Sequence, residues 1–263
     1  MTGARHMNGM PRARLAISVE RPDLVAEYVP LLQRMGCDTQ ILAWAEDYVR
    51  QHAGRIASDV DYLTARYHVT RCLNVGGAPF LFEYLLRKQL PTVGLASLDL
   101  DPERFPQASA LLGIDILPID IEAAREEATA LAGKFDCVVL CEIFEHFRLD
   151  LLGTIATVRS LLAEGGVLYL TTPNGVSLAS LKRVLAGNTG PDPLGEWSKL
   201  ARLGHMGHVR EYSLREVTRV LNASGFRIVS ADYRQRDDGS WTRHFAAMRP
   251  SLGSEIVLVA ERC

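Results

Sequence analysis

The spacing of apolar residues changes part-way along the chain and divides it into two regions. In the first region, apolar residues recur at helical spacing over residues 23–35, which follow Pro22, and again over residues 40–67. We therefore predict an N-terminal helical lobe, or lid, over residues 15–68. Residues 1–14 are polar and aperiodic, so we expect them to form a disordered leader.

Short apolar runs alternate with helical patterns through residues 69–263, which we predict to form one domain. The runs at 72–75, 93–98, 114–119, 137–141, 167–171, 226–233 and 255–260 have the length and composition of β-strands. Helical spacing occupies residues 80–89, 121–132 and 149–163, and a further helix is capped by Ser213 and ended by Gly225. This alternation predicts a parallel sheet with helices on both faces.

Residues 175–208 interrupt the alternation. The stretch is rich in glycine and proline and contains only short helical pieces. Long insertions of this kind in a compact domain commonly cover or line a binding site. We therefore predict a lid or binding loop here.

Composition and charge narrow the class of protein. The 29 basic residues are spread along the chain and nearly balance the 31 acidic ones, which argues against a dedicated nucleic-acid-binding protein. No apolar run approaches the length of a membrane span. The five cysteine residues form no C-x-x-C pair, so we expect reduced thiols and a cytoplasmic protein.

The strand predicted at 137–141 ends abruptly in ionisable residues. Glu142, Glu145 and His146 follow it within five positions. Parallel α/β sheets bind their ligands at the carboxyl ends of the strands, and charged groups gathered there are costly to desolvate unless they bind something. The segment therefore marks a candidate site.

Three other strand ends carry residues suited to a nucleoside ligand. Gly76 and Gly77 follow the first strand, where glycine lets the backbone approach a ligand closely. Asp99 follows the second strand and could accept both hydroxyls of a ribose, and we prefer it to Asp101, which precedes Pro102 and resembles a helix cap. Asp120 follows the third strand, where its side chain suits the cap of a helix.

The order of elements and strand-end residues over about residues 70–262 resembles the class I S-adenosylmethionine-dependent methyltransferases. The resemblance implies a Rossmann-like, seven-stranded, mostly parallel sheet with an antiparallel last strand, and S-adenosylmethionine as cofactor. It implies cofactor-binding roles for Asn74, Gly76, Gly77, Asp99, Asp120, Ile121 and Glu142. The first loop departs from the family pattern, because Asn74 replaces an acid and Ala78 and Phe80 replace two glycines.

The Glu-x-x-Glu-His stretch at 142–146 resembles that of two methyltransferase groups, the ubiquinone-pathway O-methyltransferases and the small-RNA 3′-terminal 2′-O-methyltransferases. In these groups a later histidine completes a divalent-metal site, and His208 matches it here, with His205 as second choice. The resemblance implies that Mg²⁺, Mn²⁺ or Zn²⁺ could be held by Glu142, Glu145, His146 and His208. In the other interpretation, His146 or His208 acts as a catalytic base without a metal.

We therefore predict a methyltransferase that modifies a hydroxyl of a small molecule, such as a sugar, a phenol or a biosynthetic intermediate. Two alternatives remain open. One is a non-catalytic binding protein of the same fold, suggested by Asn74, Ala78 and Phe80. The other is a methyltransferase for the 3′ end of RNA, which the near-neutral charge makes the weaker choice. Homodimer formation also stays open.

Overall fold

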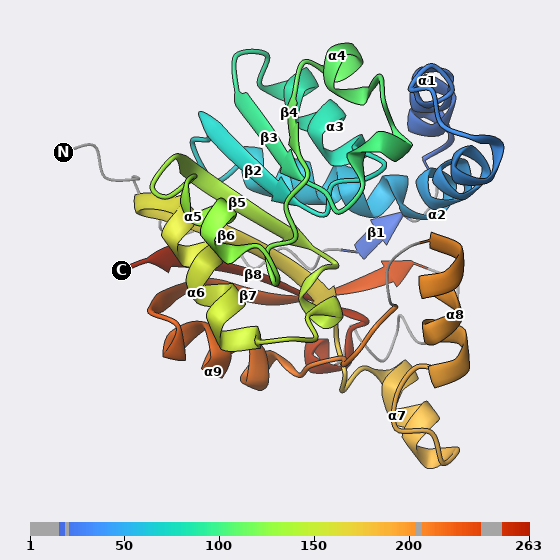
Figure 1. The fold of residues 1–263 in the computed structure, drawn as a ribbon. Helices are drawn as coiled ribbons and strands as arrows, with labels where there is room; N and C mark the ends of the chain where they lie inside the picture. Colours follow the sequence, from blue (N-terminus) through green and yellow to red (C-terminus); the bar gives the residue numbers. More distant parts are fainter. Residues whose placement is uncertain (1–15, 19–20, 204–206, 238–248) are drawn as a thin grey trace.

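The computed structural model describes residues 16–18, 21–203, 207–237 and 249–263, and these form a three-layer α/β/α structure (Figure 1). The strands are β1 (Ala16–Ser18), β2 (Arg71–Val75), β3 (Gly94–Leu98), β4 (Asp115–Leu117), β5 (Phe135–Cys141), β6 (Leu162–Pro173), β7 (Phe226–Asp237) and β8 (Glu255–Arg262). They form one sheet in the order β1-β7-β8-β6-β5-β2-β3-β4. The predicted leader lies outside the described residues.

The direction of the strands confirms the predicted Rossmann-like sheet. Strand β8 runs antiparallel to both of its neighbours, β6 and β7, whereas the other paired strands are parallel. The short strand β1 adds to the seven predicted strands and pairs in parallel with β7 at the edge of the sheet. It lies in the stretch for which the pattern predicted only helices, because three residues are too few to show a strand period.

The helices are α1 (Pro22–Leu32), α2 (Thr39–Thr64), α3 (Leu81–Gln89), α4 (Ala108–Leu112), α5 (Arg125–Thr129), α6 (Leu151–Leu161), α7 (Leu178–Leu185), α8 (Pro193–Leu203) and α9 (Leu214–Ala223). The helix predicted over 121–132 is reduced to the five residues of α5, because residues 121–123 form a turn. The capping box predicted at Ser213 is present, with Glu216 as its reciprocal partner.

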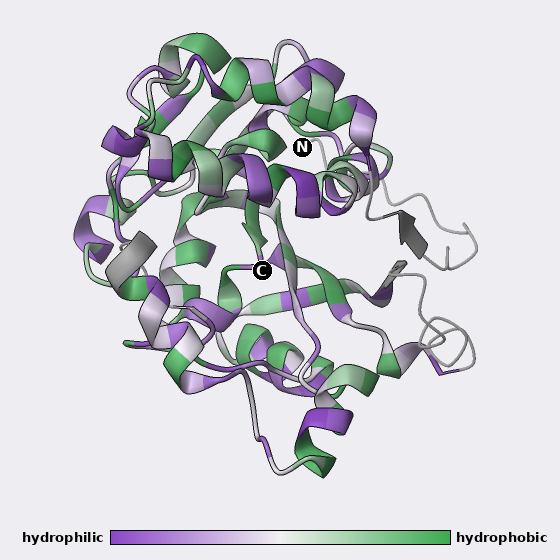
Figure 2. Ribbon diagram, turned by 90° about the vertical axis from the view of Figure 1, so that its right-hand side faces the viewer, coloured by the Kyte–Doolittle hydropathy of each residue, from purple (hydrophilic) through white to green (hydrophobic). Residues whose placement is uncertain are grey.

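Alternate residues of each central strand enter two separate cores, which explains their continuously apolar sequences. In β5, Cys137 and Val139 pack under the layer that contains α1, α2, α3 and α4. Val138 and Leu140 face the opposite layer, which contains α5, α6 and α9. Figure 2 shows apolar colouring concentrated on the strands between the two layers, with polar stretches on the outer helices. Among the described residues, no helix is both long and apolar enough to cross a membrane.

A buried ion network fastens α2 to the far half of the sheet. Arg234 of β7 donates from Nη1 to Asp59 Oδ1 of α2 at 2.6 Å and from Nε to Glu255 Oε2 of β8 at 2.5 Å. Tyr169 of β6 donates its hydroxyl proton to the same Asp59 oxygen at 2.8 Å. Arg234 and Asp59 have no solvent exposure, so each charge depends on its partners for the solvation that water would otherwise provide.

This network predicts a large effect of removing its central cation. We expect Arg234→Gln to lower the free energy of unfolding by about 3–5 kcal/mol, because Asp59 and Glu255 would remain buried without their guanidinium partner. The matched control is Arg227→Gln on the same strand, where Arg227 is 57% exposed and pairs with Glu261, and we expect a change below about 1 kcal/mol. Urea denaturation of both variants measures the difference, and equal effects would contradict the assigned role.

Candidate functional site

The site lies where the strand order of the sheet reverses. From β2 the chain proceeds outward to β3 and β4, and β5 then returns to the other side of β2. Such a reversal leaves a crevice at the carboxyl ends of β2 and β5. The first of two adjoining cavities opens there, with a volume of about 210 Å³. Five of the predicted cofactor-binding residues line it: Gly76, Asp99, Asp120, Ile121 and Glu142.

The turn after β2 requires glycine at both predicted positions. Gly76 has φ +71°, and a Cβ atom there would lie 2.3 Å from Ile143 Cδ1. At Gly77 a Cβ atom would lie 2.2 Å from Glu83 Oε1. Phe80, at the position of the third family glycine, takes the left-handed conformation with φ 64°, and its buried ring packs edge-on against Phe105. Burial of this ring offsets the cost of a left-handed backbone at a bulky residue.

Asn74 and Gly77, two of the predicted cofactor-binding residues, are not among the residues that line the first cavity. Asn74 is buried and donates from Nδ2 to Glu83 Oε1 of α3 at 2.9 Å. A carboxylate is therefore present behind the glycine turn, although it comes from α3 and not from the strand. Glu83 was not among the predicted site residues, although its position three residues from both Phe80 and Leu86 places a charge on the apolar face of a helix.

Asp99 lines the cavity and Asp101 does not, which is consistent with the preference for Asp99. Asp99 is only 5% exposed, accepts from the backbone N–H of Asp101 at 2.9 Å and lies 3.6 Å from Arg104 Nη2. The side chain of Asp101 is 55% exposed. The carboxylate of Asp99 is thus held by a backbone donor and a cation at the rim of the cavity.

Asp120 caps a turn, and its role as a cofactor ligand stays a prediction. Its Oδ1 accepts from the backbone N–H groups of Glu122 at 2.9 Å and Ala123 at 3.3 Å, as a turn cap does. It also lines the first cavity beside Ile121, which is buried. Arg148 lies 3.8 Å from the other carboxylate oxygen.

The second cavity, of about 450 Å³, shares Trp44, Tyr48, Glu142 and His146 with the first. Its remaining walls come from α2, from α7 and α8 of the insertion and from the loop that carries His208. Trp44 and Tyr48 line both cavities because one face of α2 lies over the ends of the strands. Glu142, at the tip of β5, has a left-handed backbone with φ 58°, an unfavourable conformation that is characteristic of functional sites.

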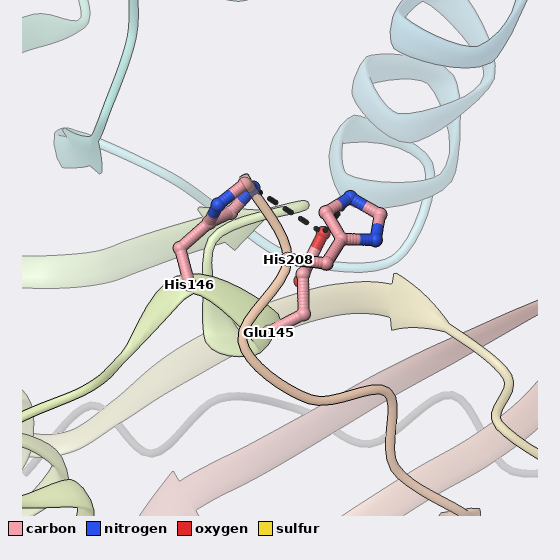
Figure 3. Close-up of side chains that lie close together, drawn as sticks. All are labelled: Glu145, His146 and His208. Carbon is pink, nitrogen blue, oxygen red and sulfur yellow. Dashed lines mark ion pairs between the residues drawn. The ribbon is translucent and has the colours of Figure 1, made fainter. Parts of the chain in front are cut away.

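Three of the predicted metal ligands converge beside the second cavity (Figure 3). Glu145 and His146 belong to the short 3₁₀ turn Phe144–His146, and His208 follows α8. Glu145 Oε1 lies 3.8 Å from His146 Nε2 and 3.7 Å from His208 Nε2. Within the described part of the chain, Glu142 is not a member of this group, in which the potential ligand atoms lie within 4.8 Å of one another. His205 lies outside the described residues.

Glu145 is completely buried beneath the two imidazoles. Its Oε2 accepts from Thr172 Oγ1 at 2.9 Å, and no described residue hydrogen-bonds to its Oε1. Burial raises the pKa of this carboxyl to about 7, and the positive charge of His208 acts in the opposite direction. An oxygen directed at two imidazoles without a hydrogen bond is suited to bind a proton or a cation.

Carbonyl and carboxylate groups orient the two imidazoles. His146 Nδ1 lies 3.0 Å from the carbonyl oxygen of Gly207, which can only accept, so Nδ1 carries the proton and Nε2 is the acceptor nitrogen of a neutral ring. His208 Nδ1 lies 3.6 Å from Glu211 Oε1, and its backbone N–H donates to Glu196 Oε2 at 2.6 Å.

Burial lowers the pKa of His208, but Glu211, Glu145 and Glu196 outweigh this effect and leave the pKa raised. Glu196 and Glu211 lie far from residues 142–146 in the sequence, and no local pattern there indicated these contacts.

Comparison with known proteins identifies the class. A family model described as a methyltransferase domain matches residues 48–231, so the chain belongs to this family. The resemblance to the class I S-adenosylmethionine-dependent methyltransferases is thereby confirmed, whereas the likeness of the Glu-x-x-Glu-His stretch to particular groups stays a prediction. No curated protein matches the sequence.

Solved structures share the fold at low sequence identity. A methyltransferase from Archaeoglobus fulgidus superposes with a TM-score of 0.58 at 16% identity, over 84% of this chain and 98% of its own. The N-methyltransferase NodS of Bradyrhizobium japonicum, solved with S-adenosylhomocysteine, has a TM-score of 0.53 at 16% identity, over 89% of this chain and 97% of its own. The 1,6-didemethyltoxoflavin-N1-methyltransferase of Burkholderia thailandensis, also solved with S-adenosylhomocysteine, has a TM-score of 0.52 at 13% identity, over 92% of this chain and 86% of its own.

Glu83 makes the stability of the fold depend on pH. Burial raises its pKa from 4.5 to about 7, against the hydrogen bond from Asn74. The protonated form is therefore favoured in the fold, and its contribution is complete below pH 4.5 and lost as the pH rises through about 7. We expect Glu83→Gln to remove a pH-dependent loss of about 3 kcal/mol over this range. Urea denaturation at several pH values tests this, with Glu103→Gln at an exposed position as control, and an unchanged slope in Glu83→Gln would contradict it.

Proposed function

We propose that the protein transfers a methyl group from S-adenosylmethionine to a hydroxyl oxygen of a small molecule. The observation that carries the proposal is the position of Glu145, His146 and His208 at the junction of two cavities, with His146 lining both. The first cavity would hold the cofactor and the second the acceptor. A methyl donor and a proton-accepting group would then meet at one point.

The first cavity offers groups that suit a nucleoside. The carboxylate of Asp99 would accept the ribose hydroxyls, and Ile121 would lie against the base. Asp120 would accept from the adenine amino group, and the turn at Gly76 would let the amino-acid part approach the backbone. The S-adenosylhomocysteine bound in two proteins of similar fold supports this choice of cofactor.

Catalysis would depend on alignment and on removal of one proton. Trp44 and Tyr48 of α2 cover the junction and would exclude water from it. His146 Nε2 is the acceptor nitrogen of a neutral imidazole and would take the proton of the acceptor hydroxyl. Glu145 would stabilise the imidazolium formed, since its Oε1 lies 3.8 Å from this nitrogen. Such a base commonly contributes about 10²–10⁴-fold.

The same residues also fit a divalent metal, and we propose this as the alternative in which His146 Nε2 is a ligand and not the base. Glu145, His146 and His208 would hold it, and the buried Oε1 of Glu145, to which no described residue hydrogen-bonds, is the observation in favour. Two imidazoles with one carboxylate suit Mn²⁺ or Zn²⁺ better than Mg²⁺, which prefers oxygen ligands. When bound, the metal would lower the pKa of an acceptor hydroxyl.

The cofactor assignment can be tested by calorimetry with S-adenosylhomocysteine. We expect binding to the wild type, and at least about tenfold weaker binding by Asp99→Asn, because charge-assisted hydrogen bonds to the ribose would be lost. Asp101→Asn is the matched control, two residues away and exposed, and its affinity should stay within about twofold of the wild type. Absence of binding to the wild type would instead favour the non-catalytic binding protein that the altered first loop suggests.

Binding of Mn²⁺ itself tests the metal assignment without measuring activity. We expect Glu145→Gln to weaken Mn²⁺ binding by at least about tenfold, because the carboxylate ligand is lost. Glu142→Gln is the comparison, since Glu142 is not a member of the converging group. Titration followed by the electron paramagnetic resonance signal of free Mn²⁺ gives both affinities. Equal binding by the wild type and Glu145→Gln would leave the histidine base as the remaining interpretation.

A further inference from the structure

One face of α2 forms a continuous wall of the second cavity. Trp44, Tyr48, His52 and Arg55 are spaced by three or four residues and all line this cavity. The rings of Trp44 and Tyr48 lie 5.7 Å apart, and those of Tyr48 and His52 lie 4.5 Å apart. The row thus presents three partly exposed rings that end at a guanidinium group.

Arg55 differs from the other cations that line the second cavity. Arg183 pairs with Glu211, and Lys199 pairs with Glu196 at 2.8 Å. Arg55 is only 4% exposed, yet among the described residues no acceptor is hydrogen-bonded to its Nε or Nη1 atom. Its Nη2 atom donates to the hydroxyl oxygen of Tyr48 at 3.1 Å.

The carboxylates beside Arg55 are paired with a neighbouring cation, Arg234. Asp59 Oδ2 lies 3.8 Å from Arg55 Nη1, beyond hydrogen-bond distance, while Asp59 Oδ1 accepts from Arg234. Arg234 also donates to Glu255. Burial lowers the pKa of Arg55, but Tyr48, Glu142, Glu255 and Asp59 outweigh this effect and leave the pKa raised. Of the four residues Arg55, Asp59, Arg234 and Glu255, only Arg55 lines either of the two cavities described above, so a ligand there would meet Arg55 and not the other three.

We infer that the acceptor is a planar, acidic molecule whose carboxylate or phosphate group binds Arg55 while its ring lies along Trp44, Tyr48 and His52. A buried guanidinium with N–H groups to spare favours an oxyanion, and aromatic side chains favour a flat ring. The inference rests on the proposed function, because it names the class of acceptor for the same site. The proposed transfer of the methyl group stays the same.

Two aromatic probes that differ in charge test the inference. Ligand-observed NMR titrations of the full chain with saturating S-adenosylhomocysteine would compare benzoate with benzamide, which has the same ring without the charge. We expect benzoate to bind at least about tenfold more tightly, and Arg55→Gln to abolish the preference. Phenyl phosphate is a third probe: tighter binding than benzoate, also lost in Arg55→Gln, would identify a phosphate-bearing acceptor.

Control variants keep the test decisive. Arg50→Gln carries the same substitution on an exposed part of the same helix and should keep the preference. Arg55→Lys retains a positive charge and should keep part of the preference for benzoate. This variant replaces Arg55→Gln in the test if Arg55→Gln does not fold. Equal affinity for benzoate and benzamide, or a preference that survives Arg55→Gln and disappears in Lys199→Gln, would overturn the inference. Calorimetry with S-adenosylhomocysteine reports on the proposed function separately.

Discussion

The guanidinium of Arg234 joins the two halves of this molecule. It is fully buried and donates to Asp59 of α2 and to Glu255 of β8, so the helical layer and the antiparallel end of the sheet share one ion network. Separating α2 from the sheet would leave charges uncompensated in a medium that solvates them poorly. The network therefore fixes the position of α2 more specifically than apolar packing alone, which tolerates small shifts.

The position of α2 determines the shape of the site. The helix runs from Thr39 to Thr64, and its first half lies over the carboxyl ends of the strands, where Trp44 and Tyr48 line both cavities. Asp59, the anchor of the helix, is four residues from Arg55, the cation at the end of the cavity wall. Asp59, which holds the helix in place, and Arg55, which is proposed to bind an acceptor, thus lie on adjacent turns. A shift of Asp59 would therefore also move Arg55.

The sequence predicted the sheet well because its strands are buried on both faces. The run at 137–141 is continuously apolar and can pack only between two layers, as Cys137 and Val138 do. The missed elements are short: β1 has three residues and α4 has five, too few to show a period. The antiparallel direction of β8 followed from the family resemblance and not from its own apolar pattern.

From the residues alone, the site could be predicted only where its residues follow strands, whereas His208 was predicted from the family resemblance. Asp99 and Glu142 stand at strand ends, and sheet geometry brings such positions together. Glu83 and Arg55 lie within helices. A single charged residue on the apolar face of a helix indicates that its side chain is buried, but it does not indicate which residue the side chain contacts. The meeting of Glu145 with His208 depends on how the insertion folds back, and α8 contributes through Glu196, which binds the backbone of His208.

Several buried polar atoms have no described hydrogen-bond partner, and each of them lowers the stability of the fold. Asn74 Oδ1, Glu145 Oε1 and Arg55 Nε are all buried, and no described residue hydrogen-bonds to any of them. Each such atom costs about 1–3 kcal/mol unless something binds it. Asn74 lies behind the first cavity, Arg55 lines the second, and Glu145 lies beneath their junction. Thr154 Oγ1 and Ser224 Oγ are also buried without a described partner, and neither residue lines the two cavities. The region of the cavities differs because charged groups, which cost more to bury than hydroxyls, gather there.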